Sequence, residues 1–153
     1  MKNLVTIIII CLAAISCVPK NSKPEEKPVL PIQGTWKLIT GTVISDGDTT
    51  VTNYEKKLSF IKIINDSHFA FLEHDLAKSR DSLQLFVAGG GRYTLDGDQY
   101  TEHLEYCSDR IWEGNDFSFT VTIKNDTLVQ RGVEKVENAA VDQINTEVYI
   151  RLK

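Results

Sequence analysis

From residue 33 onward, apolar residues recur at every second position in short runs, and turn-forming dipeptides separate the runs. A period of two is typical of a β-strand that buries one face. Two segments, 74–82 and 134–146, lack this period and are expected to be irregular or weakly helical. The predicted strands cover 34–44, 58–64, 68–73, 83–88, 92–95, 98–106, 117–124, 127–133 and 147–153.

Eight or nine strands joined mainly by tight hairpins indicate an all-β, antiparallel, up-and-down meander. Such a sheet leaves no exposed edge strand when it closes on itself. We therefore expect a single β-barrel of about 8–10 strands, because closure removes the exposed edges of the sheet. A sandwich of two sheets is the structural alternative.

The Asp96-Gly97 dipeptide is a strong hairpin signal, because the two central residues of a type I′ turn need positive φ. This turn pairs Tyr93 with Tyr100 and gives the hairpin one aromatic face and one polar face. We expect the aromatic face to point inward, which carries Glu102 into an apolar environment where a carboxylate is costly unless it is paired. The predicted inward row is Tyr93, Leu95, Tyr100, Glu102, Leu104 and Tyr106.

The Asn125-Asp126 dipeptide predicts a second hairpin with a similar mixture inside. Alternation from Phe117 to Ile123 defines its apolar face, and the turn places Gln130 on the same face beside Gly132. Tyrosines, a glutamate and a glutamine around one interior are typical of a small-molecule cavity. The alternative is a structural network in which these groups satisfy one another and a buried water.

Two strands have faces that the pattern leaves undecided. In 58–64, Lys62 interrupts one of the two possible apolar rows. In 68–73, either Phe69 and Phe71 or His68 and Leu72 could point inward.

The N-terminal residues are expected to form an export signal rather than part of the fold. Lys2 precedes an apolar stretch from Leu4 to Ile15 that is shorter than the roughly 20 residues of a membrane span. The run 12–17, Leu-Ala-Ala-Ile-Ser-Cys, resembles the lipobox of bacterial lipoproteins, which implies cleavage before Cys17 and its lipidation. An ordinary signal peptide is the alternative. The predicted organisation is a signal peptide over 1–17, a flexible, proline-rich tether over 18–30 and one domain over 31–153.

Charge and motif content argue against several functions. The net charge is −4 and the basic residues are not clustered, so no nucleic-acid partner is expected. The three histidines lack zinc-site spacing, and no serine lies in a nucleophile-elbow sequence. Cys107 is expected to be a small buried residue rather than a catalytic thiol. We therefore expect no metal, no cofactor and no catalytic residue.

Gly34-Thr35-Trp36 near the start of the domain and Arg151 in its last strand resemble the lipocalin (calycin) signature. In that family the tryptophan plugs the base of the barrel and a late arginine packs across its ring. Three further segments resemble a group of uncharacterised lipocalin-like domains of bacterial secreted proteins and lipoproteins. They are Phe69-Ala70-Phe71, 88–93 (Ala-Gly-Gly-Gly-Arg-Tyr) and 97–106. The resemblance covers 32–153 and implies a lipocalin-like barrel with an internal cavity.

These observations predict a non-catalytic barrel on a lipid anchor in the bacterial cell envelope, periplasmic or at the outer membrane, that binds a small hydrophobic or amphipathic molecule. Segment 74–82 is a candidate portal loop. The alternative is an envelope interaction or inhibitor module with a purely structural core and an exposed apolar patch. The expected ligand-binding residues are Tyr93, Tyr100, Glu102, Tyr106 and Gln130.

Overall fold

The computed structural model describes residues 30–77 and 85–153. Cys17, the predicted signal and tether, and most of the predicted portal loop lie outside these ranges; of that loop, His74 and Asp75 belong to a strand. No helix within the described ranges is long and apolar enough to cross a membrane. The strands are β1 (Gly34–Ser45), β2 (Asp48–Asn53), β3 (Leu58–Ile64), β4 (His68–Asp75), β5 (Phe86–Asp96), β6 (Gln99–Cys107), β7 (Asp116–Lys124), β8 (Thr127–Val136) and β9 (Val141–Arg151), and two 3₁₀ turns are η1 (Arg110–Trp112) and η2 (Glu137–Ala139).

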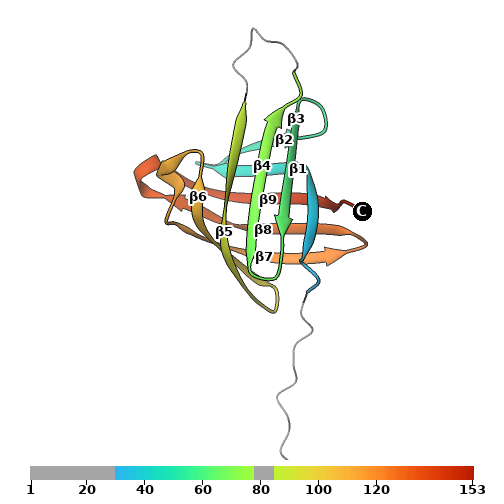
Figure 1. The fold of residues 1–153 in the computed structure, drawn as a ribbon. Helices are drawn as coiled ribbons and strands as arrows, with labels where there is room; N and C mark the ends of the chain where they lie inside the picture. Colours follow the sequence, from blue (N-terminus) through green and yellow to red (C-terminus); the bar gives the residue numbers. More distant parts are fainter. Residues whose placement is uncertain (1–29, 78–84) are drawn as a thin grey trace, which may run out of the picture.

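The strands form one antiparallel sheet in the order β2-β1-β3-β4-β5-β6-β7-β8-β9, and β1 also pairs with β9. The β1–β9 pairing closes eight strands into an up-and-down barrel, and β2 extends from the second half of β1. In Figure 1, β3, β4 and β5 pass in front of β7, β8 and β9 and run across them. The predicted closed barrel is therefore confirmed.

The expectation that 134–146 is irregular or weakly helical is wrong. This segment completes β8 and begins β9, and the two strands pair as far as Val136 and Val141 around η2. The period of two was hidden because the inward positions Glu134 and Asn145 carry polar rather than apolar side chains. Segment β2 was also missed; it lies outside the closed barrel and buries little.

One of the two predicted hairpin turns is confirmed, and the other is shifted by one residue. Asn125 and Asp126 have φ of 49° and 59°, the type I′ combination, and Val121 lies opposite Gln130 as expected. In the other hairpin the loop is Gly97 and Asp98 rather than Asp96 and Gly97, and Gly97 has φ of 62°.

This shift places Tyr93 opposite Glu102 instead of Tyr100. A slip of one residue in the pairing would have turned every side chain to the other face. Because the change is two residues, the predicted facing of this part of the hairpin survives, and Tyr100 and Glu102 point inward.

A β-bulge overturns the last part of the predicted inward row. Gly90 pairs with Tyr106 but Gly91 pairs with Leu104, so Glu105 is an extra residue. The alternation reverses after it: Tyr106 is 68% exposed, and Cys107 packs against the core. A Cβ at position 91 would collide with the carbonyl oxygen of His103, so glycine permits this close approach. The prediction that Tyr106 lines the interior is therefore wrong.

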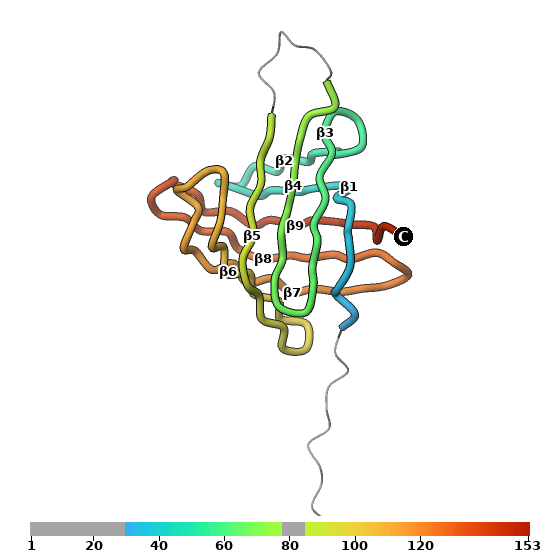
Figure 2. The backbone as a smooth tube through the Cα atoms, viewed as in Figure 1, coloured from blue at the N-terminus to red at the C-terminus, as the bar shows by residue number. Residues whose placement is uncertain are grey.

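The base of the barrel is closed around Trp36, whose side chain has no exposed area. Its indole N–H donates to the carbonyl of Ile32 at 2.7 Å, and the guanidinium of Arg151 lies 4.0 Å from the ring centroid. Gly34 has φ of 138°, and a Cβ there would meet this guanidinium. The predicted contact between Trp36 and Arg151 is thus confirmed. Figure 2 shows the β3–β4 and β5–β6 turns at the same end as the start of β1.

Candidate functional site

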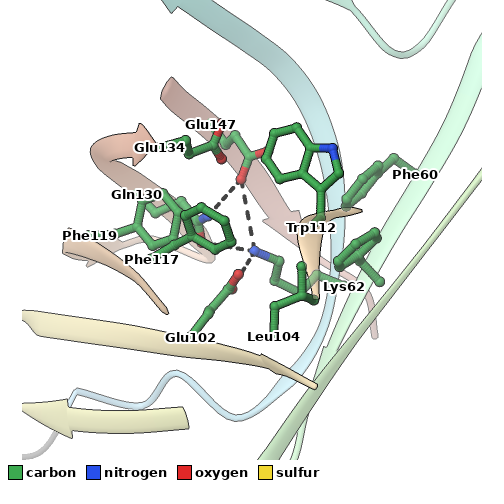
Figure 3. Close-up of a pocket in the computed structure, with 11 residues that line it drawn as sticks. Phe60, Lys62, Glu102, Leu104, Trp112, Phe117, Phe119, Gln130, Glu134 and Glu147 are labelled. Carbon is green, nitrogen blue, oxygen red and sulfur yellow. Dashed lines mark hydrogen bonds and ion pairs between the residues drawn. The ribbon is translucent and has the colours of Figure 1, made fainter. Parts of the chain in front are cut away.

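The charged group at the centre of the barrel is Lys62, which the sequence left unassigned. Its side chain points inward from β3 between Phe60 and Ile64, and the residue is 2% exposed. Its ammonium donates to Glu102 Oε1 at 2.7 Å and to Gln130 Oε1 at 3.2 Å. These contacts join β3, β6 and β8 through the interior (Figure 3).

The network continues onto β9 through Glu147. Gln130 Nε2 donates to Glu147 Oε2 at 2.6 Å, and the hydroxyl of Tyr149 donates to the same oxygen at 2.7 Å. Glu147 also lies 3.9 Å from the ammonium of Lys62. The two predicted interior polar residues, Glu102 and Gln130, are therefore linked through a lysine and a second glutamate.

A third carboxylate, Glu134 on β8, completes the polar side. It accepts hydrogen bonds from Gln143 at 2.8 Å and from Asn145 at 2.9 Å, both on β9. Within the described ranges, no cation forms an ion pair with Glu134 at 4.0 Å or less.

Burial and mutual charge shape the protonation of these groups. Burial lowers the pKa of Lys62, but Glu102 and Glu147 more than offset this, so its pKa lies above the ordinary value and the ammonium keeps its proton. Burial raises the pKa of Glu102, and Lys62 offsets only part of that rise. Burial also raises the pKa of Glu134; hydrogen bonds from Asn145 and Gln143 oppose the rise, and the nearby charge of Glu147 adds to it.

A cavity of about 130 Å³ lies beside this network, and Trp36 is not among its lining residues. A dry apolar cavity of roughly 150 Å³ in another protein holds one benzene molecule, so this volume suits a few heavy atoms or a few waters. Trp112 reaches the cavity from η1 and packs against Phe117 with ring centroids 5.9 Å apart. The lining residues are Phe60, Lys62, Phe71, Glu102, Leu104, Trp112, Phe117, Phe119, Gln130, Glu134 and Glu147 (Figure 3).

The structure separates the predicted site residues into two groups. Glu102 and Gln130 line the cavity, whereas Tyr106 is on the outer face. Tyr100 is fully buried beside Glu102 without lining the cavity. Tyr93 is half-buried near the base, where its hydroxyl donates to the carbonyl of Asn65 at 2.8 Å and its ring packs against Tyr100.

Sequence reasoning missed Lys62, Trp112, Glu134 and Glu147. A usable signal existed for Lys62, because a predicted inward Glu102 needs a cation, and Lys62 was the residue that interrupted an apolar row. Nothing comparable marked Glu134, which lay in a segment without visible alternation.

A second hollow, of about 590 Å³, lies over β4, β5 and β6 and is mainly apolar. Ala70, Leu72, Ala88, Gly90 and Tyr106 are among the residues that line it. Leu72 is 37% exposed and Tyr106 68%. Its existence follows partly from the bulge that turns Tyr106 outward.

Two comparisons with known proteins find no relative of this chain. A scan against protein-family models finds none that matches, and a search of curated proteins finds no match. The fold defines the class: an antiparallel, eight-stranded, up-and-down barrel consistent with a lipocalin-like fold.

Proposed function

We propose that this protein is a lipid-anchored, lipocalin-like barrel that binds a small, partly apolar molecule in its interior without catalysing a reaction. The observation that best supports interior binding is the cavity, which has aromatic rings on one side and hydrogen-bonding groups on the other. Small-molecule sites combine apolar walls with a few fixed polar groups in this way. The Trp36–Arg151 contact and the Gly34 backbone support the lipocalin-like part of the proposal.

The protonation of Lys62 favours binding over catalysis. A lysine acts as a nucleophile when its pKa is lowered so that the free amine is populated. Here the neighbouring carboxylates raise the pKa of Lys62, and Glu102 is held against it at 2.7 Å. We therefore infer that Lys62 and Glu102 determine the shape and charge of the cavity wall.

The binding proposal is tested by filling the cavity. Native mass spectrometry of the full chain purified from its own host should show a bound small molecule. Leu104→Trp, which places bulk in the cavity, should abolish that adduct, whereas Leu72→Trp on the outer face should retain it. An unmodified mass for the parent protein, or an adduct that persists in the folded Leu104→Trp variant, would contradict interior binding.

The anchor is tested separately, because it rests on Cys17. A fatty-acid analogue fed to the bacterial host should label the full chain, and Cys17→Ser should remove the label while Cys11→Ser keeps it. Secretion of an unlabelled parent protein would support the ordinary signal peptide instead.

The outer hollow favours a second function, that of an interaction module in the cell envelope. Exposed apolar side chains beside a depression are typical of protein-binding surfaces. Tyr106→Ser should then abolish cross-linking to a partner protein and leave any interior ligand in place. Loss of the interior ligand in the same variant would favour the cavity over the outer surface.

A further inference from the structure

The polar side of the cavity carries more negative than positive charge. Three carboxylates line it, from Glu102, Glu134 and Glu147, and the cavity lining contains one cation, Lys62. Lys62 contacts Glu102 at 2.7 Å and lies 3.9 Å from Glu147. Glu134 accepts hydrogen bonds only from the amides of Gln143 and Asn145, and no cation of the described ranges lies within 4.0 Å of it.

The remaining wall of the cavity is aromatic. Five rings face it, and an aromatic ring attracts a cation to its face with about 0.5–2 kcal/mol, more when water is excluded. The protein already uses this contact, since the ammonium of Lys62 lies 5.3 Å from the centroid of Tyr149. The five rings are those of Phe60, Phe71, Trp112, Phe117 and Phe119.

A metal ion does not fit this arrangement. Within the described ranges, no three acidic, histidine or cysteine side chains are grouped closely enough to hold one. Hard cations need several oxygen ligands at about 2.0–2.6 Å. The separation of the carboxylates and the aromatic wall between them suit a larger cation with an apolar part.

We infer that the interior ligand is a small organic cation, a protonated primary amine with a short apolar chain. Its ammonium lies toward Glu134 and Glu147, and its chain lies against the rings and Leu104. The size limit follows from the cavity of about 130 Å³. The inference rests on the proposed interior binding and adds the charge of the ligand to it.

Three probes of nearly equal size test the charge: n-butylamine as the cation, n-butanol as the neutral molecule and butyrate as the anion. Each is titrated into the full chain at pH 7.5, and the fluorescence of Trp112 at the cavity is followed; Trp36 is buried at the base and provides a steady background. n-Butylamine should bind at least about tenfold more tightly than n-butanol, which corresponds to about 1.4 kcal/mol. Butyrate should bind weakest.

Matched variants assign the preference to the carboxylates. Glu134→Gln and Glu147→Gln should each reduce the ratio between n-butylamine and n-butanol about tenfold, and Glu137→Gln, the same change at an exposed residue of η2, should leave it unchanged. Equal binding of n-butylamine and n-butanol would overturn the inference and leave the proposed function intact. Failure of all three probes to bind would overturn both. If neither glutamate variant changes the ratio, the preference does not come from this site and the inference is wrong.

Discussion

The two cations inside the barrel, Arg151 at the base and Lys62 in the middle, are held in different ways. Arg151 keeps 22% of its side chain exposed, stacks on Trp36 and donates to the carbonyls of Pro31 and Gln33, and its Nε lies 3.6 Å from the half-exposed carboxylate of Asp126. Lys62 keeps only 3% of its side chain exposed and depends on carboxylates. A delocalised, weakly hydrated guanidinium can be held by a ring and backbone oxygens, whereas a buried ammonium needs opposite charge. The base is therefore closed mainly by packing, and the middle is organised by charge.

The strongest test of this contrast removes the buried cation. Lys62→Met should lower the free energy of unfolding by about 3–5 kcal/mol, because it leaves the glutamates uncompensated in the interior. Urea denaturation at pH 7 measures the loss. Lys37→Met, at a partly exposed lysine that lies 3.9 Å from Glu55, serves as the control and should change little.

Removing Glu102 as well should recover part of the loss. The double variant Lys62→Met, Glu102→Gln replaces a broken ion pair by neutral groups, which is far less costly than one unpaired charge. If Lys62→Met alone is as stable as the parent protein, the buried network does not organise the middle of the barrel.

The corresponding change at the base should cost less. Arg151→Met removes the stacked cation, its bonds to backbone carbonyls and its half-exposed ion pair with Asp126. It keeps an apolar chain over Trp36, so we expect a loss of about 1–2 kcal/mol. Thermal and urea unfolding measure it, with Arg151→Lys expected to lie between the two. A loss equal to that of Lys62→Met would remove the distinction between the two cations.

A pH series sharpens the account of the middle. Burial raises the pKa of Glu134, so the native state binds this proton more tightly than the unfolded state does. Its contribution to stability is fully present below the ordinary carboxyl pKa of about 4.3 and is lost as pH rises through the raised pKa. Glu134→Gln should therefore gain stability relative to the parent protein as the pH rises from about 4.3 towards neutrality.

Melting temperatures of both proteins across that range measure the difference. Glu137→Gln, at an exposed position, should track the parent protein at every pH. A constant difference for Glu134→Gln would show that its proton binding does not change on folding.

The smallest effect is expected on the outer face. Tyr106→Ser should change the free energy of unfolding by less than about 0.5 kcal/mol, because the side chain is 68% exposed beyond the bulge. Chemical denaturation of the variant and the parent protein measures this change. A loss of several kcal/mol would place Tyr106 back in the interior, where simple alternation had put it.

The sequence was most informative where burial and alternation agreed. The hairpin at Asn125 and Asp126 could be predicted in register, because positive φ at both turn residues and a clean apolar row point to the same pairing. The contact between Trp36 and Arg151 at the base was implied by the resemblance to the lipocalin signature, and the pairing of the first strand with the last brings the two residues together.

The sequence was least informative where polar side chains point inward. Lys62, Glu134 and Glu147 occupy positions that alternation reserves for apolar residues, so a pattern based on hydrophobicity either breaks there or assigns no strand. Their placement depends on partners contributed by β3, β6, β8 and β9, which only the closed barrel brings together. The bulge at Glu105 was missed for another reason: the alternation of residues 98–106 gives no sign that one residue of this strand is left unpaired.

The β-bulge at Glu105 also sets the position of a side chain that can be labelled chemically. By reversing the alternation it turns Cys107, the only cysteine in the described ranges, toward the core, while the backbone N–H of Cys107 is held by Glu113 at 3.0 Å. Cys107 is still only partly buried, and it also lines the outer hollow over β4, β5 and β6, so a thiol reagent would attach a label there. The rate of alkylation in the native protein would therefore report how accessible that hollow is, without any introduced cysteine.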